Sequence, residues 1–130
     1  MEKEFAGVKT HKDLDVWKKS IDFVTQLYNV TTAFPKEEIY GLTNQLRRAA
    51  VSIPSNIAEG AARKSNKEFI QFLHIALGSS AELETQLIIS NNLKFMNDET
   101  FHEIDKKRNE IGKMLFGLIR YRKNIISEKG

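Results

Sequence analysis

Residues 40–60, YGLTNQLRRAAVSIPSNIAEG, carry the pattern on which the fold prediction rests. Apolar residues recur at steps of four, three, four and four, which places them on one face of a helix: Leu42, Leu46, Ala49, Ile53 and Ile57. A polar row runs beside them: Gln45, Arg48, Ser52, Asn56 and Glu59. We interpret this stretch as a central helix of a four-helix bundle.

Pro54 interrupts the pattern from within. Proline has no amide hydrogen and its ring presses on the preceding turn, so the carbonyl of Ala50 loses its usual bond. The apolar row nevertheless continues in register, and Ile53 would be a poor N-cap for a second helix. We therefore expect one continuous helix, kinked at Pro54, in which Ser52 or a water molecule bonds the freed carbonyl.

A first helix is expected upstream, from about Asp13, a suitable N-cap, to Thr32. It carries two apolar rows. The first has the three-four spacing of a bundle seam: Leu14, Trp17, Ile21, Val24 and Tyr28. The second lies on another face: Val16, Phe23, Leu27 and Val30. A helix with two apolar faces is central or is covered by another subunit, so we assign the second row to an oligomer interface.

The central helix itself is expected to begin near Lys36. The preceding Pro35 needs no amide partner in a first turn, and the acids after it favour the positive end of the helix dipole. Ser65-Asn-Lys-Glu68 matches a capping box and predicts a third helix to about Asn91. Small residues at 78–81 indicate close approach of another backbone, for which residues 49–50 or 58 are candidates.

A fourth helix is expected from about Asp98 to Ile126. Arg108 and Arg122 fall in its three-four rhythm at positions where apolar residues are expected. Four helices of similar length with short connections predict an all-α, antiparallel, up-down-up-down bundle. Residues 13–127 make up this domain, and residues 1–12 are expected to form a flexible arm.

Composition limits the class of protein. At 130 residues the chain is one domain large enough for a real core, and it contains no cysteine for disulfides or thiolate zinc sites. The formal charge of +3 favours anionic partners mildly, since acidic and basic residues are interspersed. The first fifteen residues lack the apolar segment of a signal peptide, and no charge-free run reaches the ~20 residues that span a bilayer. We expect a cytoplasmic protein with no membrane partner.

The run YGLTNQLRRAAVSIPSNIAEGAARKSNKEFIQFLHIALGSSAELETQL, residues 40–87, resembles the core of the four-helix-bundle proteins encoded in 23S ribosomal RNA intervening sequences. Leu14-Asp-Val-Trp17 and Thr31-Thr-Ala-Phe-Pro35 are similar to the first helix and turn of that family. The resemblance is close over residues 13–95 and looser beyond them.

The resemblance implies an assembly and a ligand, neither of which follows from the spacing of apolar residues along the helices. The family has no established catalytic activity. Its members, like the related accessory protein of diversity-generating retroelements, form barrel-shaped homopentamers with basic surfaces, and that accessory protein works with a reverse transcriptase and nucleic acid. The resemblance therefore implies a homo-oligomer, a pentamer, that binds RNA or DNA.

Basic residues that would contact nucleic-acid phosphates form three groups: Arg47 and Arg48; Arg63, Lys64 and Lys67; Arg120, Arg122 and Lys123. The residues of each group can also stabilise the fold itself and bind no ligand, and the sequence favours this structural interpretation. Arg48 is able to pair with Glu59, Glu82 or Glu84 within the bundle, and cations near a helix C-terminus are favoured by the dipole alone. Tyr121 adds an aromatic ring that is able to stack on a base.

No motif names a reaction. Glu82 and Glu84 are two residues apart and point to different sides of a helix, the three histidines are scattered, and neither a Glu-x-x-His pair on facing helices nor a Gly-rich phosphate loop is present. We expect no enzyme, no cofactor and no metal. The first hypothesis is a homo-oligomer that binds RNA or DNA; the alternative is a scaffold or accessory subunit that docks a protein partner on exposed apolar helix faces.

Overall fold

The computed structural model describes residues 10–129, and every regular element in that range is helical. Four long helices follow one another: α1 (Asp15–Thr31), α2 (Leu42–Ala61), α3 (Asn66–Asn92) and α4 (Asp98–Lys129). Two short 3-10 turns, η2 (His11–Asp13) and η3 (Lys36–Glu38), precede α1 and α2. The expected arm falls largely on residues 1–9, which lie outside the described range. None of the described helices combines the length and the apolar character that a membrane crossing requires.

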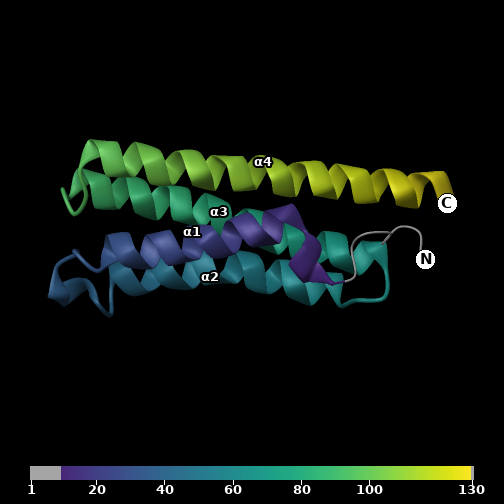
Figure 1. Cartoon of the computed structure of the whole chain (residues 1–130), viewed down its shortest axis with the longest axis horizontal. Helices are drawn as coiled ribbons and strands as arrows, with labels where there is room; N and C mark the ends of the chain where they lie inside the picture. The colour runs from purple at the N-terminus through teal and green to yellow at the C-terminus, as the bar shows by residue number, and fades with distance from the viewer. Residues whose placement is uncertain (1–9, 130) are drawn as a thin grey trace.

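The four helices form the expected up-down bundle (Figure 1). α1 packs against α2 and α4, and α3 packs against the same two helices. The order around the bundle axis is therefore α1, α2, α3, α4. It follows that the side formed by α1 and α2 lies opposite the side formed by α3 and α4, the lower and upper pairs of Figure 1.

α2 runs without interruption through Pro54, as expected. The prediction for Ser52 was wrong, because none of its bonds within residues 10–129 reaches the carbonyl of Ala50. Instead the Asn56 amide donates to the Ser52 carbonyl at 2.8 Å and to its hydroxyl at 2.9 Å, and the Ser79 hydroxyl donates to the Ser52 hydroxyl at 2.8 Å. The polar row beside Pro54 thus joins α2 to α3. The kink at Pro54 stays a prediction.

Two helix starts differ from the predictions. α1 begins two residues late, because residues 11–13 form η2 and the extended Leu14 (φ −78°, ψ 127°) occupies the N-cap position. α2 begins at Leu42 and not near Lys36, because η3 is a separate turn. A Glu38 carboxylate oxygen accepts from the Leu42 amide at 3.0 Å and supplies the cap.

The predicted N-cap at Ser65 is confirmed: the Glu68 amide donates to the Ser65 hydroxyl at 3.1 Å, the Ser65 hydroxyl donates to a Glu68 carboxylate oxygen at 3.3 Å, and α3 follows. α4 starts in a similar way, since the Asn97 side chain accepts from the Thr100 amide at 2.7 Å. These caps satisfy amides that a helix start leaves without an internal partner.

The burial of the two apolar rows of α1 differs from the prediction. Phe23 and Leu27 are 1% and 0% exposed in the core of their own chain, Val16 is also buried and Val30 is half-buried, whereas Ile21 and Tyr28 are 37% and 41% exposed. The assignment of Val16, Phe23, Leu27 and Val30 to an oligomer interface was therefore wrong. The buried row includes Ser20 and Thr31, whose hydroxyls donate to the carbonyls of Trp17 and Leu27, both at 2.8 Å.

The close approach of α2 and α3 occurs at Gly60 and not at Gly78. A Cβ atom on Gly60 would lie 2.8 Å from both the Phe69 ring and the Phe72 Cβ, whereas one on Gly78 would meet nothing within 4 Å. Gly78 is exposed, whereas the next two residues, Ser79 and Ser80, are buried. The small residues of α3 therefore serve contacts with the neighbouring helices at Ser79 and Ser80.

Candidate nucleic-acid interface

The C-terminal half of α4 lies against the start of α3. An Arg122 NH group donates to the Asn66 side-chain oxygen at 2.9 Å, and its guanidinium lies 4.9 Å from the centre of the Phe69 ring. Arg122 is only 5% exposed. The prediction that Arg122 contacts nucleic acid is therefore wrong, because the side chain is enclosed between the two helices.

This contact brings two of the three predicted groups to one end of the bundle. Arg63 and Lys64 lie in the connection between α2 and α3, Lys67 lies in the first turn of α3, and Arg120 and Lys123 flank Arg122 on α4. All five side chains are exposed. We call them the basic end: Arg63, Lys64, Lys67, Arg120 and Lys123.

Arg63 is the member of the basic end with the most contacts. It pairs with Glu59 one turn earlier at 2.9 Å, and its guanidinium lies 4.9 Å from the centre of the Phe72 ring. An exposed pair of this kind contributes little to stability. The acid nevertheless competes with an incoming phosphate, so the lysines and Arg120 are the better candidates for ligand contact.

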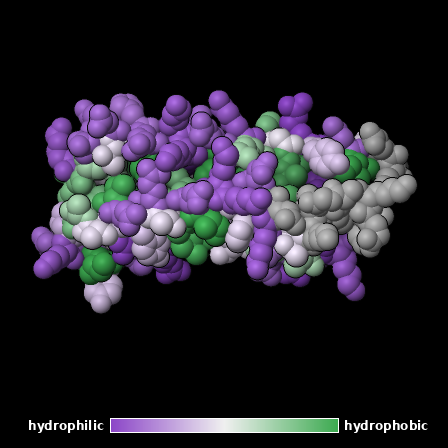
Figure 2. Space-filling view, in the orientation of Figure 1, coloured by the Kyte–Doolittle hydropathy of each residue, from purple (hydrophilic) through white to green (hydrophobic). Residues whose placement is uncertain are grey.

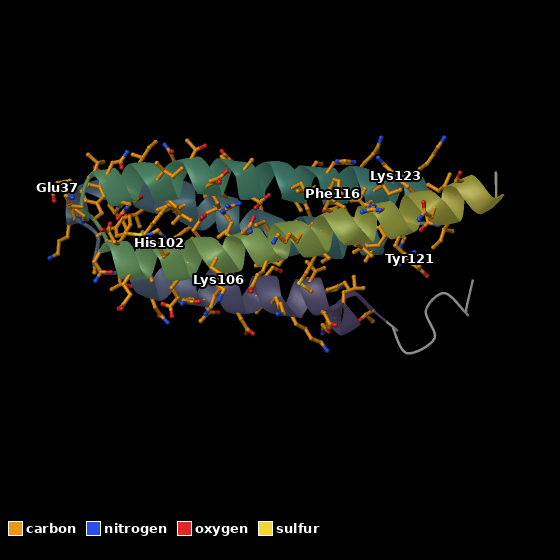
Figure 3. The ribbon with its side chains drawn as sticks, turned by 90° about the horizontal axis from the view of Figure 1, so that it is seen from above. Glu37, His102, Lys106, Phe116, Tyr121 and Lys123 are labelled. Carbon is orange, nitrogen blue, oxygen red and sulfur yellow. The ribbon has the colours of Figure 1, made fainter. Side chains whose placement is uncertain are left out.

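Tyr121 is exposed next to these cations, and Figure 3 places it near the end of α4 together with Lys123. Acidic residues gather at the opposite end, in the first turns of η3 and α4: Glu37, Glu38, Asp98 and Glu99. Glu37 marks that end in Figure 3. Lys36 and Lys94 lie at that end as well, so the difference in charge between the two ends is modest.

The third predicted group lies elsewhere and divides between two roles. Arg47 Nε donates to the Thr31 hydroxyl at 2.9 Å, a second NH group donates to the Tyr28 carbonyl at 3.3 Å, and the guanidinium lies over the Tyr28 ring at 4.5 Å. Arg47 thus caps the C-terminal turn of α1, and its assignment to ligand contact stays a prediction.

Arg48 is exposed and does not pair with the acids proposed for it. Within the described range Glu59 pairs with Arg63, and Glu84 pairs with Arg108. The structural interpretation of Arg48 is therefore wrong, and the residue stays a candidate for an external contact.

Arg108 occupies an apolar position in the three-four spacing of α4, and the sequence predicted no function for it. It is 7% exposed and donates to Asp105 at 2.7 Å, to the Ser80 hydroxyl at 3.2 Å and to Glu84 at 3.3 Å. The bonds to Ser80 and Glu84 tie α4 to α3. Among residues 10–129, no group of three or more His, Asp or Glu side chains is arranged to hold a metal ion.

These features define an all-α, up-down four-helix bundle with one basic end. The family model described as "23S rRNA-intervening sequence protein" matches residues 12–117. The chain belongs to the 23S rRNA-intervening sequence protein family.

A solved structure supports the same assignment. The crystal structure of a protein with unknown function from the S23 ribosomal protein family of Bacteroides thetaiotaomicron VPI-5482 matches with a TM-score of 0.73 and 27% sequence identity, covering 80% of this chain and 97% of that chain. The comparison with curated proteins finds no match.

Proposed function

We propose that the protein is a non-enzymatic homo-oligomer that binds RNA or DNA through the basic end. The observation that carries the proposal is the bond between Arg122 and Asn66. It holds the exposed cations of α4 beside those of the connection between α2 and α3.

The basic end suits contact with phosphates more than reading of bases. Lysine and arginine side chains on a convex surface neutralise backbone phosphates without distinguishing sequence. The exposed Tyr121 ring offers a surface on which a base of a single strand stacks. Binding by one subunit is weak, and several copies in one assembly convert it into useful avidity.

The names of the relatives guide the choice of ligand. The family description refers to 23S rRNA, and the matched structure belongs to a family called ribosomal. Those words concern the relatives; for this chain they support testing single-stranded RNA first and DNA second.

The test compares two triple variants with equal charge. One is Lys64→Glu, Lys67→Glu, Lys123→Glu at the basic end; the other is Lys36→Glu, Lys94→Glu, Lys106→Glu, whose exposed lysines lie at or toward the opposite end. Fluorescence anisotropy with a labelled RNA at low salt should show the first variant about tenfold or more weaker than wild type and the second much closer to it. Equal losses would mean that total charge decides, and absence of binding by the wild type would overturn the proposal.

The alternative function is a scaffold that docks another protein. Ile21, Tyr28 and Phe116 are large apolar side chains that the fold leaves exposed, and they are the surface that such a partner would cover. This alternative predicts weak RNA binding that both triple variants reduce alike.

A further inference from the structure

The end of the bundle opposite the basic end carries large apolar side chains that the core of the chain does not cover. Tyr40 is 92% exposed, Leu93 is 54% exposed and Ile39 is 48% exposed. Ile39 and Tyr40 belong to the connection between α1 and α2, and Leu93 is the C-cap residue of α3. We call these three residues the apolar tip. Figure 2 shows hydrophobic surface at this end of the bundle, over the connection between α1 and α2.

The two connections that carry the apolar tip are packed against each other by an aromatic contact. The centres of the Phe34 and Phe95 rings are 5.5 Å apart, and Phe34 is buried. Phe34 lies five residues before Ile39 in the first connection, and Phe95 lies two residues after Leu93 in the second. The contact between the two rings therefore keeps the apolar tip together at one end of the bundle.

The turn that presents Tyr40 is ordered by its own hydrogen bonds. The Gly41 amide donates to the Glu38 carbonyl at 2.9 Å, and the Leu42 amide donates to a Glu38 carboxylate oxygen at 3.0 Å. A Cβ atom on Gly41 would lie 2.8 Å from the same oxygen and would displace this cap. Ordered backbone on both sides of Tyr40 lowers the entropy cost of binding, and tyrosine is among the residue types that contribute most to interfaces. The Tyr40 side chain therefore suits contact with a partner.

The charged residues of this end are mainly acidic. The two connections and the first turn of α4 contain four carboxylates and two lysines: Glu37, Glu38, Asp98, Glu99, Lys36 and Lys94. The last turns of α1 and α3 and the first turn of α2 contain no charged residue. With four negative charges against two positive ones, the sign at this end is opposite to the net +3 of the whole chain. Asp98 and Glu99 also favour the start of α4 through the helix dipole, but both side chains are exposed and their charge stays at the surface.

This charge selects among the partners that the apolar tip is able to bind. The carboxylates repel phosphates, so a nucleic acid does not suit this end of the bundle. A protein surface on which lysine and arginine residues border an apolar pocket matches both the apolar tip and the acids around it.

We propose that the apolar tip docks onto another protein, at a site where lysine and arginine residues border an apolar pocket. Tyr40 enters the pocket, Ile39 and Leu93 extend the apolar contact, and the exposed carboxylates of Glu37 and Glu99 pair with the basic residues at its rim. The inference goes beyond the proposed function, because it concerns the opposite end of the bundle and does not require RNA binding. A chain that binds at both ends links a nucleic acid to a basic protein.

The probe for this site is a set of random peptides displayed on phage and selected on the full chain. The enriched peptides should combine an aromatic or aliphatic residue with lysine or arginine residues. Fluorescence anisotropy of a labelled synthetic copy then measures the affinity, which Tyr40→Ala should weaken about tenfold or more. The double variant Glu37→Lys, Glu99→Lys should also weaken binding, and more at low salt than at high salt, because salt screens exposed charges at a rim.

Tyr121→Ala is the matched control, because it removes the same exposed side chain at the basic end. It should leave the affinity for the peptide unchanged. Tyr40→Ala should in turn leave the affinity for a labelled RNA unchanged. Thermal unfolding followed by circular dichroism checks that all variants fold, as the exposure of the two tyrosines leads us to expect.

The inference has clear contrary outcomes. It is overturned if no peptide is enriched, if the enriched peptides are acidic, or if wild type and Tyr40→Ala bind the peptide equally. A lower molar mass of Tyr40→Ala than of wild type in light scattering would mean that a second copy of the chain covers the apolar tip instead. Peptide binding without RNA binding would contradict only the nucleic-acid proposal, whereas RNA binding without peptide binding would contradict only the docking.

Discussion

The arginines show how far single positions are readable from the sequence. Arg108 and Arg122 take apolar positions in the rhythm of α4, and both are buried, although Arg122 had been assigned to nucleic-acid contact. Their partners were not predictable, because Ser80, Glu84 and Asn66 are brought to them only by the packing of α3 against α4. A buried polar position is thus visible from spacing along one helix, whereas its bonds depend on the neighbouring helix.

Arg108 provides a prediction about stability. Its acidic partners reach solvent and are rehydrated when the arginine is removed, so the main loss is the packing of its stem. Arg108→Met should change the free energy of unfolding by no more than about 1 kcal/mol, and Arg108→Ala should cost about 2 kcal/mol. Urea unfolding measures both, with exposed Arg120→Met as the control. A loss above about 3 kcal/mol for Arg108→Met would mean that the ionic bonds dominate.

Two glycines provide a matched pair. Alanine at exposed Gly78 gains helix propensity without a clash and should stabilise the fold by up to about 1 kcal/mol. Alanine at Gly60 gains the same propensity, but its Cβ overlaps Phe69 and Phe72, and overpacking costs about 1–3 kcal/mol. Thermal unfolding should therefore show a higher Tm for Gly78→Ala and a lower Tm for Gly60→Ala. Shifts of the same sign would contradict the packing of α2 on α3.

At the scale of helices, the existence and order of the four elements followed from the apolar periods, but the orientation of α1 did not. Its buried row passes through Ser20 and Thr31, whose hydroxyls donate to carbonyls of their own helix and so satisfy their hydrogen-bonding needs inside the core. A search for apolar residues alone overlooks these two positions. The competing row, Leu14 to Tyr28, is continuous and apolar, so periodicity favoured the wrong face.

The cap of α3 was readable because it depends on residues close in sequence, whereas the starts of α1 and α2 differed from the predictions. The Ser65 cap of α3 supports a prediction: Ser65→Ala should cost about 1 kcal/mol and Ser65→Asp should keep most of the stability. Ser55→Ala, an exposed serine in the middle of α2, is the control and should not destabilise the fold. Equal effects of the two alanine substitutions on urea unfolding would argue against the cap.

At the scale of the molecule, the sequence revealed the basic groups but not which of them lie together in the fold. Arg63, Lys64 and Lys67 are more than fifty residues from Arg120 and Lys123, and only the fold brings them to one end. The fold also removed Arg122 from the candidates by enclosing its side chain between α3 and α4. The surface of the molecule therefore has exposed cations at one end and exposed apolar residues along its sides. The cations suit an anionic partner, and the apolar residues suit a protein partner.

The dependence of RNA binding on salt tests the central claim, that phosphates bind at the basic end. For wild type, the logarithm of the association constant should fall linearly with the logarithm of the salt concentration. The Lys64→Glu, Lys67→Glu, Lys123→Glu variant should have a slope shallower by about 2, since each single-strand phosphate contact contributes roughly 0.7. The Lys36→Glu, Lys94→Glu, Lys106→Glu variant should keep the wild-type slope. Slopes that change equally in both variants, or not in the first, would contradict binding at this end.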